Sequence, residues 1–191
     1  MVLYIHSREL LGGDRRRPEG MDNVADVVIE EARLEDRALL ENLLELYLHD
    51  LSEVFPIEIG PDGRFGYDKL PRYWSEPNRR FPFLIRNGDR VVGFILVTLG
   101  SPAIDDPNVH DIAEFFVMRR HRRGGIGRKA AILAWNRYPG KWTVRVSEGN
   151  TGALTFWSET ITRHTNGDVE MSELPGTPYR WRVFTFDSHE G

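Results

Sequence analysis

The chain has 191 residues, of which 40% are hydrophobic and 28% are charged, an ordinary composition for one globular domain. It contains no cysteine, which excludes a disulfide framework, a thiol nucleophile and a cysteine-based metal site. The net charge of -4 disfavours a general nucleic-acid binder, and no apolar run approaches the ~18 residues of a transmembrane helix. We therefore expect a cytoplasmic protein with neither nucleic acid nor membrane as a partner.

The first 22 residues differ in composition from the rest of the chain. The stretch Gly12–Gly20 is rich in glycine and arginine and has no run of apolar residues. We interpret residues 1–22 as a mobile tail, or as an extension upstream of a start at Met21. Residues 23–191 are then expected to form a single domain.

The first half of this domain alternates apolar segments with breaker residues. Val27–Ile29 is predicted to be a strand, and the dense leucines of Leu34–Leu51 predict a strongly apolar helix. Glycines and prolines in residues 55–66 indicate a loop, and Tyr67–Trp74 is expected to form a short helix. A hairpin follows, with Asn87-Gly88 as its predicted tight turn.

The second half is predicted to alternate strands and helices and to end on two strands. The apolar run Ile112–Met118 predicts a buried strand, and helical spacing predicts a helix from Ile126 to Tyr138. A strand at Thr143–Val146 precedes a helix at residues 151–163. Two closing strands are expected, at Asp168–Leu174 and Tyr179–Phe186.

The segment between the buried strand and its helix is basic and rich in glycine. Arg119 to Lys129 contains six Arg or Lys residues together with His121, which is expected to face solvent. A glycine turn that opens a helix favours anion binding, because the first helical N–H groups are unpaired and lie at the positive end of the helix dipole. The alternative interpretation is a solvated basic helix start.

This turn carries a family resemblance. Arg122-Arg123-Gly124-Gly125-Ile126-Gly127 fits the Arg/Gln-x-x-Gly-x-Gly/Ala signature of the GCN5-related N-acetyltransferases (GNAT). The preceding strand has the family's spacing, and Asn150-x-x-Ala153-x-x-Phe156-Trp157 resembles the family's Asn-x-x-Ala-x-x-Phe-Tyr helix. The similarity covers roughly residues 25–187. It implies an α/β (α+β) fold, with a mixed, mostly antiparallel central sheet flanked by helices on both faces.

The resemblance also implies an activity. Members transfer an acetyl group from acetyl-CoA directly to a primary amine of a small molecule or peptide, and no metal is needed. Dimers are common among them, so a homodimer is one candidate state. The residues that the resemblance assigns to the cofactor are Phe116, Val117, Met118, Arg122, Arg123, Gly124, Gly125, Ile126, Gly127, Arg128 and Asn150. For Asn150 the simpler role of a helix N-cap stays open.

Proton transfer is the less certain part of the chemistry. Glu114 matches the position of a general base in some members, and burial in a strand would raise its pKa to suit that role. His110 and Asp111 are weaker candidates, and His110 is expected to be an exposed residue at the end of the strand. Trp157 replaces the family's tyrosine acid and cannot donate its indole proton, so Tyr179, water or an unprotonated thiolate leaving group would have to serve.

The acceptor is expected to meet the first helices and their loop, where acidic and aromatic residues favour a cationic amine. Tyr67, Tyr73 and Trp74 are the predicted substrate-binding residues. Two alternatives to an enzyme stay open. One is a non-catalytic acyl-CoA-binding or regulatory module on the same fold, which the tryptophan at position 157 favours. The other is a nucleic-acid binder that uses the basic turn.

Overall fold

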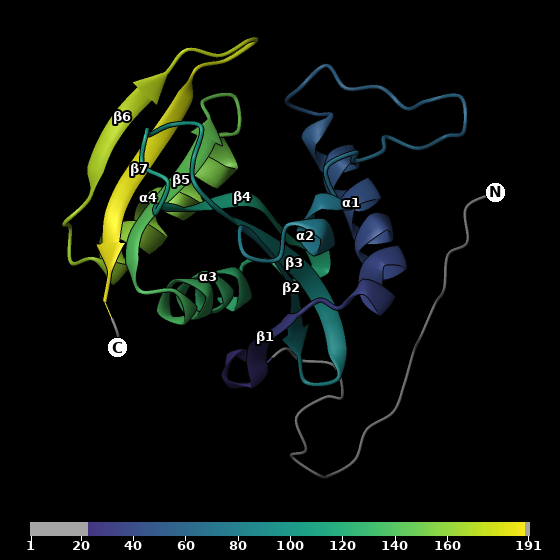
Figure 1. Ribbon diagram of the computed structural model, residues 1–191, viewed down its shortest axis with the longest axis horizontal. Coiled ribbons are helices and arrows are strands. Elements are labelled where there is room, and N and C mark those ends of the chain that lie inside the picture. The colour runs from purple at the N-terminus through teal and green to yellow at the C-terminus, as the bar shows by residue number, and fades with distance from the viewer. Residues whose placement is uncertain (1–22, 190–191) are drawn as a thin grey trace, which may run out of the picture.

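The computed structural model describes residues 23–189, and the predicted tail 1–22 lies outside them (Figure 1). One sheet organises these residues. Its strands are β1 (Val27–Glu31), β2 (Arg80–Asn87), β3 (Arg90–Leu99), β4 (His110–Val117), β5 (Gly140–Ser147), β6 (Glu170–Leu174) and β7 (Trp181–Ser188). The helices are α1 (Arg37–Leu51), α2 (Arg72–Ser75), α3 (Ile126–Arg137) and α4 (Thr151–His164). Short 3-10 helices occupy Val24–Asp26, Leu34–Asp36 and Arg119–His121.

The sheet has the strand order β1-β2-β3-β4-β5-β7-β6. All neighbouring strands are antiparallel except β4 and β5, which are parallel and joined through α3. The predicted mixed and mostly antiparallel sheet is therefore confirmed, as is the predicted order of strands and helices.

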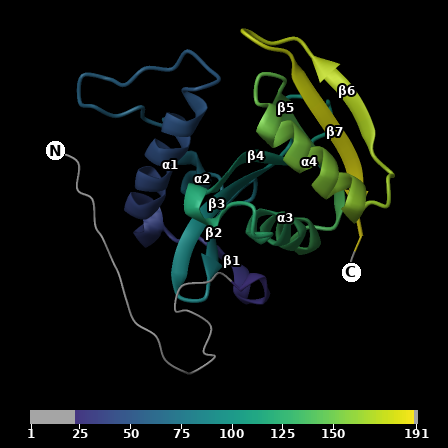
Figure 2. The ribbon, with the colours of Figure 1, turned by 180° about the vertical axis from the view of Figure 1, so that it is seen from behind.

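Helices cover both faces of the sheet (Figures 1 and 2). The α3 and α4 face buries a cluster that includes Trp135, Trp142 and Trp157. The α1 face buries a second cluster, built on Leu40 and Leu44 of α1. Burial of these apolar side chains is the main term that holds each helix against the sheet.

The pairing between β4 and β5 is short and ends at a fork. It runs only from His110 opposite Trp142 to Ile112 opposite Val144. Beyond that rung the two strands separate, and the register of β4 against β3 shifts so that Ala113 is an extra residue. Such a bulge bends a strand and redirects its side chains. Both irregularities occur in the middle of the sheet, where they create space between the two arms of the fork.

Four local expectations from the sequence need correction. The hairpin turn is Gly88-Asp89, because Asn87 pairs with both Val27 and Arg90 and so extends β2 by one residue. The short helix is confined to Arg72–Ser75. His121 is buried, and His110 is partly buried between the rings of Tyr138 and Trp142.

Candidate active site

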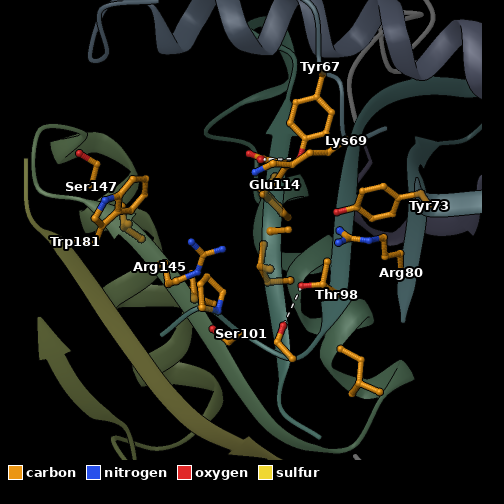
Figure 3. Close-up of a pocket in the computed structure, with 18 of the residues that line it drawn as sticks. Tyr67, Lys69, Tyr73, Arg80, Thr98, Ser101, Glu114, Arg145, Ser147 and Trp181 are labelled. Atoms are coloured by element: carbon orange, nitrogen blue, oxygen red, sulfur yellow. Dashed lines mark hydrogen bonds between the residues drawn. The ribbon is translucent and has the colours of Figure 1, made fainter. Parts of the chain in front are cut away.

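A cavity of about 1260 Å³ occupies the fork (Figure 3). Its lining comes from α1, the 55–80 segment, the loop after β3, and the facing arms of β4 and β5, with Trp181 of β7 at one side. Residues far apart in the sequence therefore meet in one cavity, and its polar side chains decide what it can bind.

Glu114 projects into this cavity from the strand segment just past the bulge (Figure 3). The Tyr47 hydroxyl donates a hydrogen bond of 2.7 Å to one carboxylate oxygen, and the Tyr67 hydroxyl donates one of 2.9 Å to the other. Both tyrosines belong to the predicted acceptor region, but their contact with Glu114 was not expected. The donors lie 67 and 47 residues away in sequence, so local patterns do not reveal the pairing.

Burial raises the pKa of Glu114, although the two tyrosine hydrogen bonds act to lower it. Burial also raises the pKa of Tyr47 and Tyr67, and the neighbouring Glu114 carboxylate adds to both shifts. The phenols therefore stay protonated and keep donating. Glu114 is thus a carboxylate that is held in place and has a raised proton affinity, which suits a general base.

A second charged group lies beside Glu114 on the other arm. Arg145 of β5 donates to both carboxylate oxygens of Asp111, at 2.8 and 3.1 Å. Asp111 is fully buried and also accepts from the hydroxyls of Ser101 (2.7 Å) and Thr143 (3.1 Å). Asp111 is therefore a partner that positions Arg145, and it does not line the cavity itself.

Arg145 was not predicted as a site residue, yet the sequence contains a signal for it. Along β5 the residues Trp142, Val144 and Val146 belong to the α3–α4 core. Because side chains alternate across a strand, Arg145 must point to the opposite face. A charged residue in an otherwise buried strand is a functional candidate when its partner is also buried.

The glycine turn lies at the end of the β4 arm of the fork. Gly125 is the N-cap of α3 with φ +88°, a left-handed conformation that glycine adopts without strain. No side chain of the described residues caps this helix, and its first turn contains no acidic residue. The N–H groups of Ile126, Gly127 and Arg128 therefore face outward as donors for an anion.

Arg122 has partners within the protein. Its Nε donates to the carbonyl of Val117 at 2.6 Å, and its terminal nitrogen forms an ion pair with Asp50 of α1. Arg119 donates to the same carboxylate at 2.9 Å. Partial burial acts to raise the pKa of Asp50, but the hydrogen bonds from Arg122 and Arg119 outweigh it and lower the pKa. Asp50 thus ties the basic turn to α1.

The remaining cofactor candidates lie along the same arm. Phe116, Val117 and Met118 form the end of β4 and the residue after it, where no strand pairs on the β5 side within the described residues. Arg123 and Gly124 are exposed in the turn. Asn150 lines the cavity, and its side chain accepts from the N–H of Ala153 at 3.0 Å, so it caps α4.

The acceptor candidates divide into two groups. Tyr67 and Tyr73 line the cavity, whereas the indole N–H of Trp74 donates to the carbonyl of Ala32 and this residue lies outside the lining. Trp157 is buried and borders the cavity. Tyr179 is 42% exposed, packs on Gly149 and does not border the cavity.

Comparison with protein-family models decides the family, because residues 40–159 match the model described as the acetyltransferase (GNAT) family. The chain belongs to the GNAT acetyltransferase family. No curated protein matches the chain.

No helix within residues 23–189 is long and apolar enough to cross a bilayer. The same residues contain no group of three or more His, Cys, Asp or Glu side chains that could hold a metal ion.

Solved structures resemble this GNAT acetyltransferase in fold. An acetyltransferase from Thermus thermophilus has 16% identity and a TM-score of 0.63, covering 87% of this chain and 99% of that one. A spermidine N-acetyltransferase from Vibrio cholerae, in complex with CoA and spermine, has 14% identity and a TM-score of 0.61, covering 86% and 96%. AAC(6')-Ib with ribostamycin and coenzyme A has 13% identity and a TM-score of 0.61, covering 85% and 93%.

Proposed function

We propose that the protein transfers an acetyl group from acetyl-CoA to a primary amine of a small molecule or peptide. One observation carries this proposal. A hydrogen-bonded carboxylate with a raised pKa, Glu114, and a glycine turn at Gly125 whose helix has no side-chain cap lie at the two ends of one free strand arm. The arm can therefore hold a long phosphorylated thioester with its reactive end beside a base. Related folds in complex with CoA support the choice of donor.

The chain's own residues fit such a donor. The outward N–H groups at the start of α3, with Arg123 and Arg128 beside them, would receive the pyrophosphate. The unpaired edge of β4 from Ala113 to Met118 would offer backbone donors and acceptors to the amide-containing arm. A Cβ on Gly127 would lie 3.3 Å from the ring of Phe156, so glycine at this position lets the start of α3 pack closely against α4.

Glu114 would then act on the acceptor. The amine nitrogen forms a bond to the acetyl carbon, the carbon–sulfur bond breaks, and the carboxylate of Glu114 takes the ammonium proton. The thiolate leaves with the electron pair of that bond. Trp157 cannot protonate it, but a thiol pKa of ~8.5 makes the thiolate a tolerable leaving group that water protonates afterwards.

A non-catalytic acyl-CoA-binding module is the second candidate. The tryptophan at position 157 favours it, because the indole supplies no proton to a leaving thiolate. Both candidates predict that acetyl-CoA binds, and they differ in turnover. Release of CoA in the presence of amines supports the enzyme, whereas tight binding without turnover supports the module.

The first test is a calorimetric titration with acetyl-CoA that compares the wild type with Gly125→Glu. The substitution places bulk, backbone strain and negative charge where the phosphates would lie. We expect the dissociation constant to rise about 100-fold, which corresponds to ~2.7 kcal/mol.

Gly63→Glu is the matched control. Gly63 has a similar φ of +76° with no neighbour within 4 Å, and it lies in the loop before α2, away from the turn. The Gly63→Glu variant should bind acetyl-CoA with the affinity of the wild type. Equal affinity in Gly125→Glu and Gly63→Glu would remove the basis for placing the donor at this turn.

A further inference from the structure

We propose that the acceptor carries a carboxylate beside its amine, as a free amino acid does, and that Arg145 and Lys69 bind this carboxylate. This inference rests on the proposed function and names the substrate class of the same cavity. It differs from the cationic amine that the sequence of the first helices favours.

The guanidinium of Arg145 is the first element of this subsite. Its side chain is 21% exposed and extends from β5 into the space between the two arms of the fork (Figure 3). Asp111 engages Nε and Nη2, so the guanidinium is held by a two-point contact. No described residue accepts a hydrogen bond from Nη1, which leaves this nitrogen as a donor for a ligand that enters the cavity. A planar guanidinium positioned in this way suits a carboxylate.

Lys69 is the second element. It lines the cavity, is exposed, and has no ion-pair partner among the described residues. Its charge acts on Glu114, which places it on the same side of the cavity as the base. Figure 3 shows Lys69 beside Glu114, opposite Arg145. An anion between Lys69 and Arg145 would therefore be contacted from the segment before α2 and from the β5 arm.

Other cations of the cavity are already neutralised or engaged. Arg72 and Arg80 both pair with Glu76, at 2.7 and 2.8 Å, and Arg79 donates to the carbonyl of Leu99. These residues form one wall of the cavity. Among the described lining cations, Lys69 is the one with no ion pair or hydrogen bond, and Arg145 keeps Nη1 free beside its contact with Asp111.

The acidic residues near the first helices are directed elsewhere. Asp50 is held by Arg119 and Arg122, and Glu45 accepts from the N–H groups of Phe65 and Gly66. Neither carboxylate lines the cavity, and the same is true of Glu53, Glu58, Asp62 and Asp68. Besides Glu114 and the paired Glu76, the lining carboxylates are Asp105 and Asp106, in the loop between β3 and β4.

The geometry of the fork limits the distance between amine and carboxylate. Ile112 and Val144 form the last rung between β4 and β5. Arg145 follows Val144 directly, and Glu114 follows Ile112 after the one-residue bulge. The base and the guanidinium are therefore the first polar side chains on the two arms, on one face of the sheet. An amine and a carboxylate separated by a few bonds can reach both, which is the spacing in an amino acid.

The test compares matched acceptors. The twenty common amino acids are assayed with acetyl-CoA as free acids and as carboxamides, with spermidine included, and acetylated products are identified by mass spectrometry. We expect a free acid to be the best acceptor, with kcat/KM at least about tenfold above that of its carboxamide. That ratio corresponds to ~1.4 kcal/mol, the scale of one hydrogen bond to a charged group.

Each alternative outcome has a distinct meaning. Amides or spermidine acetylated as well as the acids, or better, would overturn the carboxylate subsite and leave the proposed function standing. A protein that binds acetyl-CoA but acetylates none of these compounds would count against both.

Two lysine variants localise the subsite. Lys69→Gln should lower the preference for the acid over its amide about tenfold, mainly through KM of the acid. Lys141→Gln makes the same charge change at an exposed position outside the cavity and should leave that preference unchanged. Equal preferences in the two variants would overturn the role of Lys69. Arg145→Lys keeps a cation beside Asp111 but removes the guanidinium, and the ratio of kcat/KM for the acid to that for its carboxamide tests the guanidinium in the same way.

Discussion

Glu114 is subject to two opposing influences on its pKa. Burial raises the pKa, whereas hydrogen bonds from Tyr47 and Tyr67 lower it by stabilising the carboxylate. The net shift is upward. Such a group takes up a proton more readily than a free glutamate, and the phenols fix its position while it does so. Keeping this carboxylate partly desolvated lowers the stability of the folded protein.

Glu114→Gln should lower kcat/KM for the acceptor by about 10²–10⁴, because a general base is lost. The defect should be largest at low pH, where the acceptor is an ammonium ion, and should shrink as rising pH supplies free amine. A pH–rate profile with acetyl-CoA at saturation checks this. Glu159→Gln, at an exposed position on α4, should follow the wild-type profile. A pH-independent defect in Glu114→Gln would assign Glu114 a structural role.

The same variant tests the cost to stability. A carboxyl whose pKa is raised by folding contributes stability below its unfolded pKa, and this contribution is lost as the pH rises through the folded pKa. Wild-type protein therefore carries the cost at neutral pH, and the glutamine variant does not. The melting temperature of Glu114→Gln at pH 7 should equal or exceed that of the wild type. The difference between the two melting temperatures should be smaller near pH 4.

Residue-scale prediction from sequence worked where one segment carried the signal. The resemblance of its own strand predicted Glu114 as a general base, and this role stays a prediction. Burial in the strand predicted a raised pKa for Glu114, which is confirmed. Its two phenol donors were not predicted as partners, because Tyr47 and Tyr67 reach it from a helix and a loop earlier in the chain. The ion pair of Asp111 with Arg145 likewise depends on the pairing of β4 with β5.

At the scale of elements, the start of α4 has one role that the structure shows and a second that stays a prediction. Asn150 caps the helix through its side-chain oxygen, which leaves its amide nitrogen for a ligand in the cavity. The cap was one of the two roles open from sequence, and the structure shows it. Contact with the cofactor is the other role, and it does not exclude the first.

Two substitutions separate these roles. Asn150→Ala removes the cap and should cost about 1 kcal/mol of stability, whereas Asn150→Ser retains a capping oxygen and should cost less than half of that. If the amide also binds acetyl-CoA, both variants should lose a similar several-fold affinity. Urea unfolding and calorimetry measure the two effects. Wild-type affinity in Asn150→Ser would restrict Asn150 to capping.

Element boundaries depended on contacts that local patterns do not encode. The Asn87-Gly88 pair correctly predicted a hairpin turn between these two strands, but the turn lies one residue later, at Gly88-Asp89. Asn87 also pairs with Val27 of β1, so it stays in the strand, and Gly88 adopts the φ of +58° that begins the turn. The predicted helix at Tyr67–Trp74 is shortened by a local feature instead, because α2 begins only after Pro71, which has no N–H to donate and restricts the residue before it.

At the scale of the whole molecule, the fork turns a continuous sheet into two arms with a cavity between them. The fold class and element order were predictable from periodicity and family resemblance. The cavity was not, because it depends on where β4 and β5 stop pairing and on which loops cover the gap. Two of the residues that line this cavity contact each other: Phe55, after α1, stacks on Trp181 of β7 with ring centroids 5.7 Å apart.

The Phe55–Trp181 stack should therefore shape the acceptor's surroundings and leave the donor's turn unaffected. An aromatic pair contributes ~1 kcal/mol beyond its buried area, so Phe55→Ala should raise the acceptor's KM about fivefold. Affinity for acetyl-CoA should be unchanged. Phe65→Ala removes the same side chain from the same connecting segment, outside the cavity lining, and should leave the acceptor's KM at its wild-type value. Because Phe55 and Trp181 both border the cavity, an equal KM in the two variants would mean that the acceptor binds without contacting this stack, deeper in the fork beside Glu114 and Arg145.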